Sequence, residues 1–330
     1  MANIIEDMQF LPLNIFTLGG RTTANFYLTL RCNMQCKDCY VLHDLPSAPK
    51  YQMPAKDVSF YLDELRNKTN FFPAAVLTGG EIFTLPKNYL QGITQRALKK
   101  GYLVEWKTNG KFGADAKSRK SVFDMVHQLN IPETSLLLNK DAVEIPLNKA
   151  TEEDKCRCGL YSENEYLAQY GLKMLADQYK LDILTSPLAL TVSVDNVVHT
   201  EESVKWYKNI LQDIVDDSDL RQKICLNHVT LGGTPDQGFY IYEGYFHNFF
   251  QGAPKKNPKD PYFGDDCLYK SNGSLEFCFW PDRTVSFESR INSQPFGRVS
   301  YVNPNGSYKD LYTIVKDMQA QLLRDYEQKR

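Results

Sequence analysis

The first half of the chain shows two hydrophobic periodicities in turn, one typical of strands and the other of helices. The run NFYLTL at 25–30 is rich in aromatic and apolar residues and predicts a buried strand. Helical spacing follows over 55–66, where apolar residues recur at Val58, Tyr61, Leu62 and Leu65. The same order then repeats, with strands expected at 74–81 and 103–110 and helices at 87–100 and 116–129. This alternation predicts parallel βα units.

The second half allows two interpretations. In the first, the fourth to sixth strands are 135–139, 188–195 and 223–231, with helices at 162–179 and 202–215. We prefer it because it distributes strands and helices evenly over the βα units. In the alternative, 188–195 is the fourth strand and 131–187 is a long insertion.

The pattern changes after about residue 232 to short strands, expected at 274–280 and 284–289, and a closing amphipathic helix. The apolar face of that helix consists of Leu311, Ile314, Val315, Met318 and Leu322. We therefore expect an α/β fold, in which an N-terminal extension (1–24) precedes a partial (β/α)6 barrel (25–232). A small α+β subdomain (233–330) completes the chain.

Charge and composition limit the possible functions. Lys and Arg total 38 against 40 Asp and Glu, a formal charge of −2, which gives no electrostatic case for binding nucleic acid. No apolar run reaches the length of a membrane span, and the N-terminal MANIIEDMQF lacks the features of a secretory signal. We expect a cytoplasmic protein whose eight cysteines are thiols or metal ligands.

Three of these cysteines, Cys32, Cys36 and Cys39, follow the first predicted strand within eight positions. Thiolates at close spacing bind zinc or iron–sulfur clusters. Structural zinc prefers four ligands, and the next cysteine is Cys156. A [4Fe–4S] cluster held by three thiolates instead keeps one iron open for a further ligand. A zinc fragment or a chance spacing remain the alternatives.

The spacing C-x3-C-x2-C resembles the cluster motif of the radical S-adenosylmethionine (radical SAM) superfamily. The aromatic residue that usually precedes the last cysteine is replaced by Asp38, and Tyr40 follows instead. The resemblance implies a [4Fe–4S] cluster on the three cysteines and S-adenosylmethionine bound beside it, with Tyr40 near the adenine.

Three further segments are similar to motifs of the same superfamily. In LTGGE, the resemblance implies that Gly79, Gly80 and Glu81 meet the amino group of S-adenosylmethionine. The resemblance of KTNG implies that Asn109 also binds S-adenosylmethionine, and that of SVD implies that Ser193 lies near the ribose. All of these residues follow predicted strands, and the carboxyl ends of parallel strands in a barrel form one functional face.

The resemblance also implies a reaction. Reductive cleavage of S-adenosylmethionine gives a 5′-deoxyadenosyl radical, which abstracts a hydrogen atom from the substrate. A reductant such as flavodoxin or ferredoxin is then a required partner.

Five cysteines remain, namely Cys156, Cys158, Cys225, Cys267 and Cys278. The segment DDCLYKSNGSLEFCFW resembles the start of a C-terminal module of peptide-modifying members, shortened here, with Asn272-Gly273 as a hairpin turn. An auxiliary cluster would require Cys156 and Cys158 to join Cys267 and Cys278. Alternatively, Cys278, or failing that Cys225, acts as a hydrogen donor, or each is a buried apolar residue.

The resulting hypothesis is a radical SAM enzyme that epimerises or cross-links a ribosomally made peptide. The same chemistry on a sugar, nucleoside or cofactor precursor is the first alternative. The second is a non-catalytic iron–sulfur protein for electron transfer.

Overall fold

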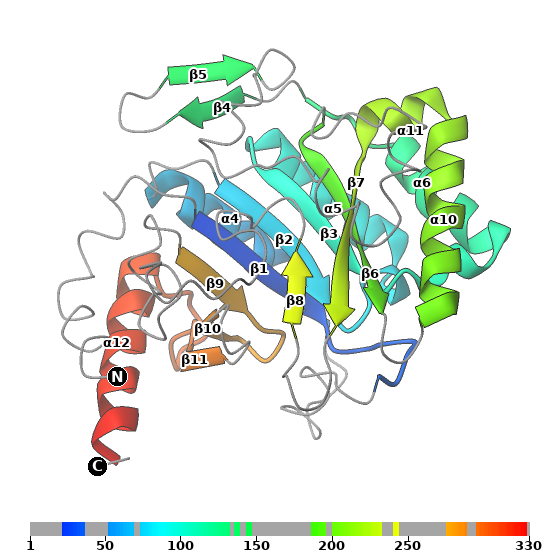
Figure 1. Cartoon of the computed structure of the whole chain (residues 1–330). Helices are drawn as coiled ribbons and strands as arrows, with labels where there is room; N and C mark the ends of the chain where they lie inside the picture. The colour runs from blue at the N-terminus through cyan, green and yellow to red at the C-terminus, as the bar shows by residue number, and fades with distance from the viewer. Residues whose placement is uncertain are drawn as a thin grey trace, which may run out of the picture. The chain divides into compact units, whose positions relative to one another are not determined.

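The computed structural model describes the greater part of the chain. The described residues are 22–36, 52–68, 73–132, 135–138, 143–146, 186–195, 200–232, 240–243, 275–288 and 295–328. They form a mixed α/β fold with helices and a mostly parallel sheet (Figure 1). The chain divides into two compact units, and the described residues of the first fall within 22–31, 52–80 and 275–328. Those of the second fall within 32–36 and 81–243.

In the first unit, the first described strand lies between strands from distant parts of the sequence (Figure 1). β1 (Thr22–Thr29) pairs in parallel with β2 (Pro73–Gly79) on one side and with β9 (Leu275–Phe279) on the other. β10 (Thr284–Glu288) and β11 (Pro295–Ser300) extend the same sheet in antiparallel pairs. The C-terminal strands therefore continue the sheet of β1. The domain boundaries expected from the sequence stay a prediction.

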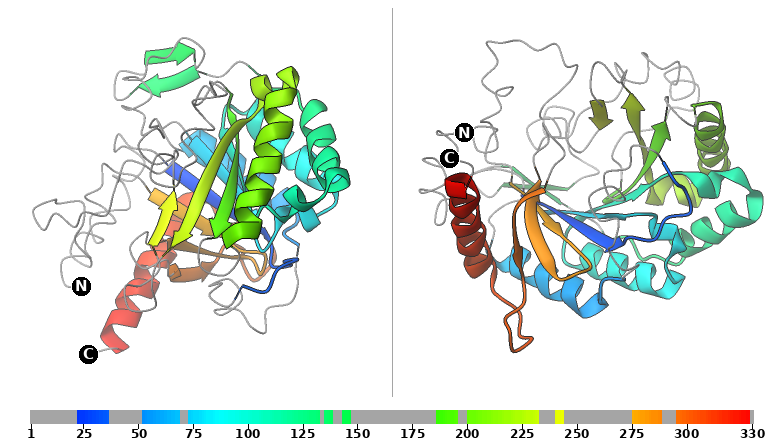
Figure 2. Two further views of the ribbon diagram at one scale, coloured as in Figure 1. Left: turned by 45° about the vertical axis from the view of Figure 1, so that its right-hand side comes forward. Right: turned by 90° about the horizontal axis from the view of Figure 1, so that it is seen from below.

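Two helices of this unit confirm the periodicity found in the sequence. α4 (Ala55–Lys68) buries its four expected apolar residues, and α12 (Leu311–Gln328) packs along β11 (Figure 2). On the predicted apolar face of α12, Leu311, Ile314, Val315 and Met318 are fully buried, and the side chain of Leu322 lies outside the described residues. Tyr312, which is not on that face, is 41% exposed. Tyr61 of α4 stacks on Phe279 with a ring separation of 4.6 Å, and Phe279 stacks on Phe26 at 5.1 Å.

A buried carboxylate joins α4 to the C-terminal part of this unit. Asp57, which is 0% exposed, accepts hydrogen bonds from the hydroxyls of Tyr301 at 3.0 Å and Tyr308 at 2.6 Å. Arg283 Nε, 3.2 Å from the same carboxylate, balances its charge, and the backbone of Arg283 has a φ of 64° in the β9–β10 turn. Burial raises the pKa of Tyr308 to about 12, with the hydrogen bond to Asp57 as the next cause.

Replacing Asp57 should therefore be costly. We expect Asp57→Asn to lower the free energy of unfolding by about 3 kcal/mol, because two hydroxyls and a guanidinium lose a charged acceptor. Tyr308→Phe removes a single hydroxyl and should cost about 1 kcal/mol. Urea unfolding of the three proteins measures both losses. Equal losses in the two variants would contradict the central role of Asp57.

The second unit contains a parallel set of three strands. β3 (Leu103–Thr108) pairs with β6 (Leu188–Asp195), which pairs with β7 (Cys225–Gly232); β8 (Tyr240–Glu243) is antiparallel to β7. The described helices of this unit are α5 (Lys87–Lys99), α6 (Ala116–His127), α10 (Thr200–Asp216) and α11 (Ser218–Lys223), with short 3-10 helices η1 (Ile82–Thr84) and η2 (Lys111–Ala114). In the part of the chain described here, no helix has the length and apolar character required to cross a bilayer.

The preferred interpretation of the second half is wrong at the expected fourth strand. Residues 135–138 form β4 (Ser135–Leu138), which pairs with β5 (Val143–Pro146) in a separate antiparallel hairpin. β6 is the direct neighbour of β3, as in the alternative interpretation. A short apolar run indicates a strand but contains no information about its pairing partner. The helix expected at 202–215 is confirmed as α10, whereas the one at 162–179 lies outside the described residues.

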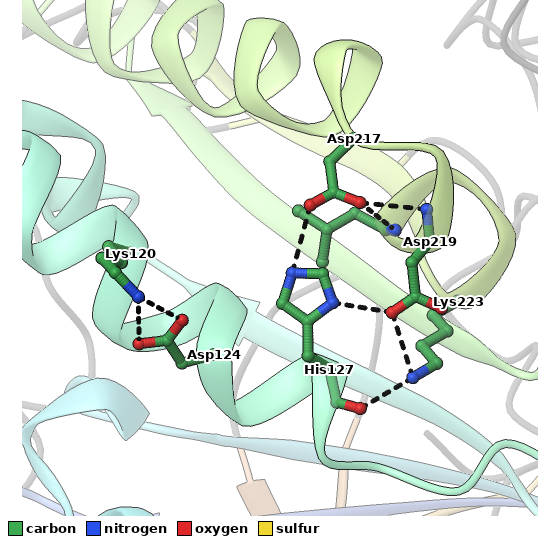
Figure 3. A network of polar contacts seen from close by, with 7 residues as sticks. Lys120, Asp124, His127, Asp217, Asp219 and Lys223 are labelled. Atoms are coloured by element: carbon green, nitrogen blue, oxygen red, sulfur yellow. Dashed lines mark hydrogen bonds and ion pairs between the residues drawn. The ribbon is translucent and has the colours of Figure 1, made fainter.

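A surface network connects the end of α6 to the start of α11 (Figure 3). His127 Nδ1 lies 2.6 Å from Asp219 Oδ2, and His127 Nε2 lies 3.1 Å from Asp217 Oδ2. Lys223 Nζ contacts Asp219 at 3.2 Å and donates to the backbone oxygen of His127 at 2.8 Å. The hydrogen bonds from His127 and Lys223 lower the pKa of Asp219.

This network should make stability depend on pH at the acidic end. A carboxyl group with a lowered folded-state pKa stabilises the fold above its unfolded pKa, and that contribution is lost as the pH falls through the folded-state pKa. Below the ordinary value of 3.8, the Tm of the native chain should therefore fall more steeply with pH than that of Asp219→Asn. Thermal unfolding over a series of acidic buffers tests this. Parallel slopes for the two proteins would count against it.

Candidate functional site

The segment after β1 presents two of the three predicted cluster ligands. Cys32 and Cys36 are part-exposed thiols. The sulfur of Cys32 accepts a hydrogen bond from the backbone N–H of Met34 at 3.4 Å. The third predicted ligand, Cys39, and the adjacent Tyr40 lie outside the described residues.

The two glycines of LTGGE allow the end of β2 to lie against the end of β1. A Cβ atom on Gly79 would stand 2.2 Å from the backbone oxygen of Thr29, and one on Gly80 would stand 2.2 Å from that of Arg31. Gly79 also has a φ of 139°, which side chains rarely allow. The chain itself therefore requires both glycines, and their contact with S-adenosylmethionine stays a prediction.

The carboxylate of Glu81 is buried, with 2% exposure. It accepts the backbone N–H of Phe83 at 3.0 Å and that of Asn109 at 2.8 Å, and the hydroxyl of Thr108 lies 2.9 Å from both oxygens. Burial raises the pKa of this carboxyl group, and the donors partly offset the rise. In this structure Glu81 therefore holds two turns together. Its predicted contact with an amino group of S-adenosylmethionine stays a prediction.

Asn109 connects this carboxylate to the cysteine segment. Its backbone N–H donates to Glu81, while its side-chain Nδ2 lies 3.5 Å from Cys32 Sγ and 2.8 Å from Asn33 Oδ1. Its Oδ1 accepts the backbone N–H of Lys111 at 2.9 Å, and Lys111 Nζ donates to the backbone oxygen of Asn33 at 2.9 Å. A distant strand end thus fixes the start of the cysteine segment.

Ser193 lies at the same end of the parallel strands as Asn109. Thr108 of β3 is opposite Val192 of β6, so the next residues, Asn109 and Ser193, lie at one level. Gly110, with a φ of 74°, turns the chain here, and a Cβ atom on it would approach Val192 Cγ1 to 2.5 Å. The expectation that Asn109 and Ser193 share the carboxyl ends of the strands is confirmed, whereas their binding roles stay predictions.

Cys225 lies at the opposite end of these strands. It is the first residue of β7 and is opposite Ala189, whereas Ser193 is opposite Val229 four residues later. Four residues span about 13 Å along a strand. This position separates Cys225 from the carboxyl-end residues, and we do not retain it as a hydrogen donor.

Cys278 lies in β9 beside β1 and is 1% exposed. The side-chain amide of Asn25 lies 3.6 Å from its sulfur. Phe279, the next residue, faces Tyr61 of α4, so Cys278 points to the other face of the sheet. The hydrogen-donor role of Cys278 stays a prediction.

The two described cysteines have the chemistry that an iron–sulfur cluster requires. Cys32 and Cys36 are soft thiols, the side chains to which such clusters bind. Within the described residues no three metal-ligating side chains gather, and Cys39 is not among those residues. Also outside them are Cys156, Cys158, Cys267 and the Asn272-Gly273 turn, so the structure leaves the auxiliary cluster a prediction.

Two residues of this network were missed by sequence reasoning. Thr108 belongs to the KTNG segment, but nothing in the sequence indicated that its hydroxyl contacts Glu81. Asn33 lay between the cysteines with no feature to indicate its contact with Asn109. Both contacts depend on strand ends that the tertiary fold brings together.

No protein-family model matches this chain, and no curated protein sequence matches it. Two solved structures of anSMEcpe are similar to it, one with bound AdoMet and Cp18Cys peptide and the other with bound AdoMet and Kp18Cys peptide. The first is 12% identical, covers 63% of this chain and 50% of the other, and has a TM-score of 0.28. The second is 14% identical, covers 64% and 51%, and has a TM-score of 0.29. This chain spans about half the length of these structures, and similarity this low defines neither a family nor a shared activity.

Glu81→Gln tests the role of the buried carboxylate. We expect a loss of about 1–3 kcal/mol in the free energy of unfolding, because the amide nitrogen faces N–H groups and leaves a buried donor without an acceptor. The raised pKa of Glu81 means that its contribution is fully present below the unfolded pKa, near 4.5, and decreases as the pH rises through the folded-state value. The loss should therefore shrink at higher pH. Urea unfolding at several pH values measures it, and a loss that grows with pH would refute the assignment.

Proposed function

We propose that this chain is a radical SAM enzyme that holds a [4Fe–4S] cluster on Cys32, Cys36 and Cys39 and binds S-adenosylmethionine beside it. One observation carries the proposal. Glu81, in the segment that resembles the glycine-rich motif, holds Asn109, which in turn donates to the first cysteine of the cluster motif. Separate segments that resemble motifs of a single superfamily are thus connected by hydrogen bonds.

We further propose that the sheet forms the wall of a partial barrel. β3, β6 and β7 are parallel, and Asn109 and Ser193 lie at their carboxyl ends. In parallel barrels, the reactive groups gather on the loops at this end. The position of both residues supports an active site there.

This proposal assigns different roles to the cofactors and to the residues of the chain. When bound, the cluster and S-adenosylmethionine supply a 5′-deoxyadenosyl radical that abstracts a hydrogen atom from an unactivated C–H bond. The chain orders the cysteine segment through Glu81 and Asn109. The residues that the resemblance implies as contacts of the nucleotide are Tyr40, Gly79, Gly80, Glu81, Asn109 and Ser193. A flavodoxin or ferredoxin is the proposed source of the electron.

We propose a ribosomally made peptide as the substrate, modified by epimerisation or cross-linking. The support is the resemblance of the segment that ends in Cys278 to the C-terminal module of peptide-modifying members. Cys278 faces away from α4 and has Asn25 beside its sulfur, and it is the proposed hydrogen donor of an epimerisation.

The test uses the full chain, purified without oxygen and reconstituted with iron and sulfide. We expect about four irons per chain and, with dithionite and S-adenosylmethionine, 5′-deoxyadenosine detectable by mass spectrometry. Cys36→Ala should lose both the bound iron and the product. Cys225→Ala is the matched control for iron content, because this cysteine lies at the opposite strand ends.

Other results of this experiment would favour other functions. Iron without any deoxyadenosine would favour the electron-transfer protein, and bound zinc would favour a structural module. About eight irons would indicate an auxiliary cluster as well. Deoxyadenosine formed without modification of any peptide would favour a small-molecule substrate.

A further inference from the structure

The sulfur of Cys32 has a hydrogen-bond donor from a residue 77 positions further along the chain. Asn109 Nδ2 lies 3.5 Å from Cys32 Sγ and 2.8 Å from Asn33 Oδ1. The amide NH2 has two N–H groups, which is enough to donate to both acceptors. The backbone N–H of Met34 is a second donor to the same sulfur. Two segments of the chain therefore place N–H groups on this thiol.

The orientation of the Asn109 amide is determined by its other contacts. Asn109 Oδ1 lies 2.9 Å from the backbone nitrogen of Lys111, which can only donate. A flipped amide would place N–H against N–H there and oxygen against oxygen at Asn33. The group directed at Cys32 is therefore the nitrogen.

The buried carboxylate of Glu81 fixes the backbone position of Asn109. Glu81 accepts the backbone N–H of Asn109 at 2.8 Å and the hydroxyl of the preceding Thr108 at 2.9 Å. Because Glu81 is 2% exposed, water does not compete for these bonds. The amide of Asn109 thus lies on a rigid turn, which is what a fixed contact to a sulfur requires.

We propose that Asn109 raises the reduction potential of the cluster by donating its side-chain N–H to the Cys32 sulfur, and that Glu81 is the positioning residue that keeps Asn109 in place. This inference rests on the proposed function. Hydrogen bonds to the sulfurs are among the factors that set the potential of an iron–sulfur cluster. Reduction adds negative charge, so an N–H donor on a ligand sulfur stabilises the reduced form more than the oxidised form.

The resemblance to the superfamily implies a different role, in which Asn109 contacts S-adenosylmethionine. That role predicts weaker binding of S-adenosylmethionine in Asn109 variants and an unchanged potential when the nucleotide is absent. The two roles are therefore separated by measuring the potential without S-adenosylmethionine.

The experiment is a redox titration of the reconstituted full chain, followed by electron paramagnetic resonance, without S-adenosylmethionine. Asn109→Asp keeps the backbone bond to Glu81 but places a carboxylate oxygen near the sulfur. At the native midpoint we expect its ratio of reduced to oxidised cluster to fall about tenfold, which for one electron is a midpoint about 59 mV more negative. Asn109→Ala should shift the midpoint in the same direction by less.

Two variants serve as controls. Asn33→Ala removes an acceptor of the Asn109 amide but leaves the bond to sulfur, so its midpoint should not become more negative. Gln95→Ala removes an amide that bonds the backbone of Asn130 at 2.7 and 2.8 Å, outside the network described here, and should leave the midpoint unchanged.

The role of Glu81 has its own readout. Glu81→Gln should make the midpoint potential more negative. The double variant Glu81→Gln/Asn109→Ala should have the same midpoint potential as Asn109→Ala alone. A purely structural role would leave the midpoint of folded, iron-loaded Glu81→Gln at the native value. Equal iron content in all variants is required for the comparison.

The outcomes separate this inference from the proposed function. If the native chain cleaves S-adenosylmethionine but the midpoints of Asn109→Ala and Asn109→Asp equal the native value, the inference alone is overturned. If the native chain takes up no cluster, both are overturned. If Asn109→Ala does not take up the cluster, the comparison of Glu81→Gln with Asn33→Ala decides. A more negative midpoint in Glu81→Gln only supports the inference, and equal midpoints overturn it.

Discussion

The buried carboxylate of Glu81 is the contact on which the candidate site depends. Removing a carboxylate from water costs several kcal/mol unless hydrogen-bond donors replace the water. Here the donors come from its own turn, at Phe83, and from the end of β3, at Thr108 and Asn109. The cost of burial is thus offset only when these two turns are correctly placed, and this makes the arrangement specific.

Gly79, Gly80 and Glu81, which resemble a cofactor motif, also have structural roles within the chain. Gly79 and Gly80 are required because backbone oxygens of Thr29 and Arg31 leave no room for a Cβ atom. Glu81 bonds backbone and hydroxyl groups of its own unit. These three residues therefore build part of the framework of the chain, and contact with a ligand is a separate property that needs a separate test.

Acidic residues have three different roles in this protein, according to their burial. Asp57 is fully buried and joins α4 to the C-terminal part of the first unit, with Arg283 nearby to balance its charge. Glu81 is buried and accepts hydrogen bonds from N–H and O–H donors. Asp219 is at the surface, where screening by solvent limits the stabilisation that its contacts with His127 and Lys223 provide.

Most of the local elements and many residues of the candidate site could be predicted from the sequence alone, but Thr108 and Asn33 could not. Helices α4, α5, α6, α10 and α12 follow from apolar periodicity, because a helix face is buried at regular spacing. The tertiary structure decided the pairing. It placed β4 in a separate hairpin and β9 in parallel beside β1, and it brought Asn109 to Glu81, 28 positions away, and to Cys32, 77 positions away. Local patterns indicate which residues are buried, whereas partners so distant in sequence are selected only when the strands and helices of a unit pack together.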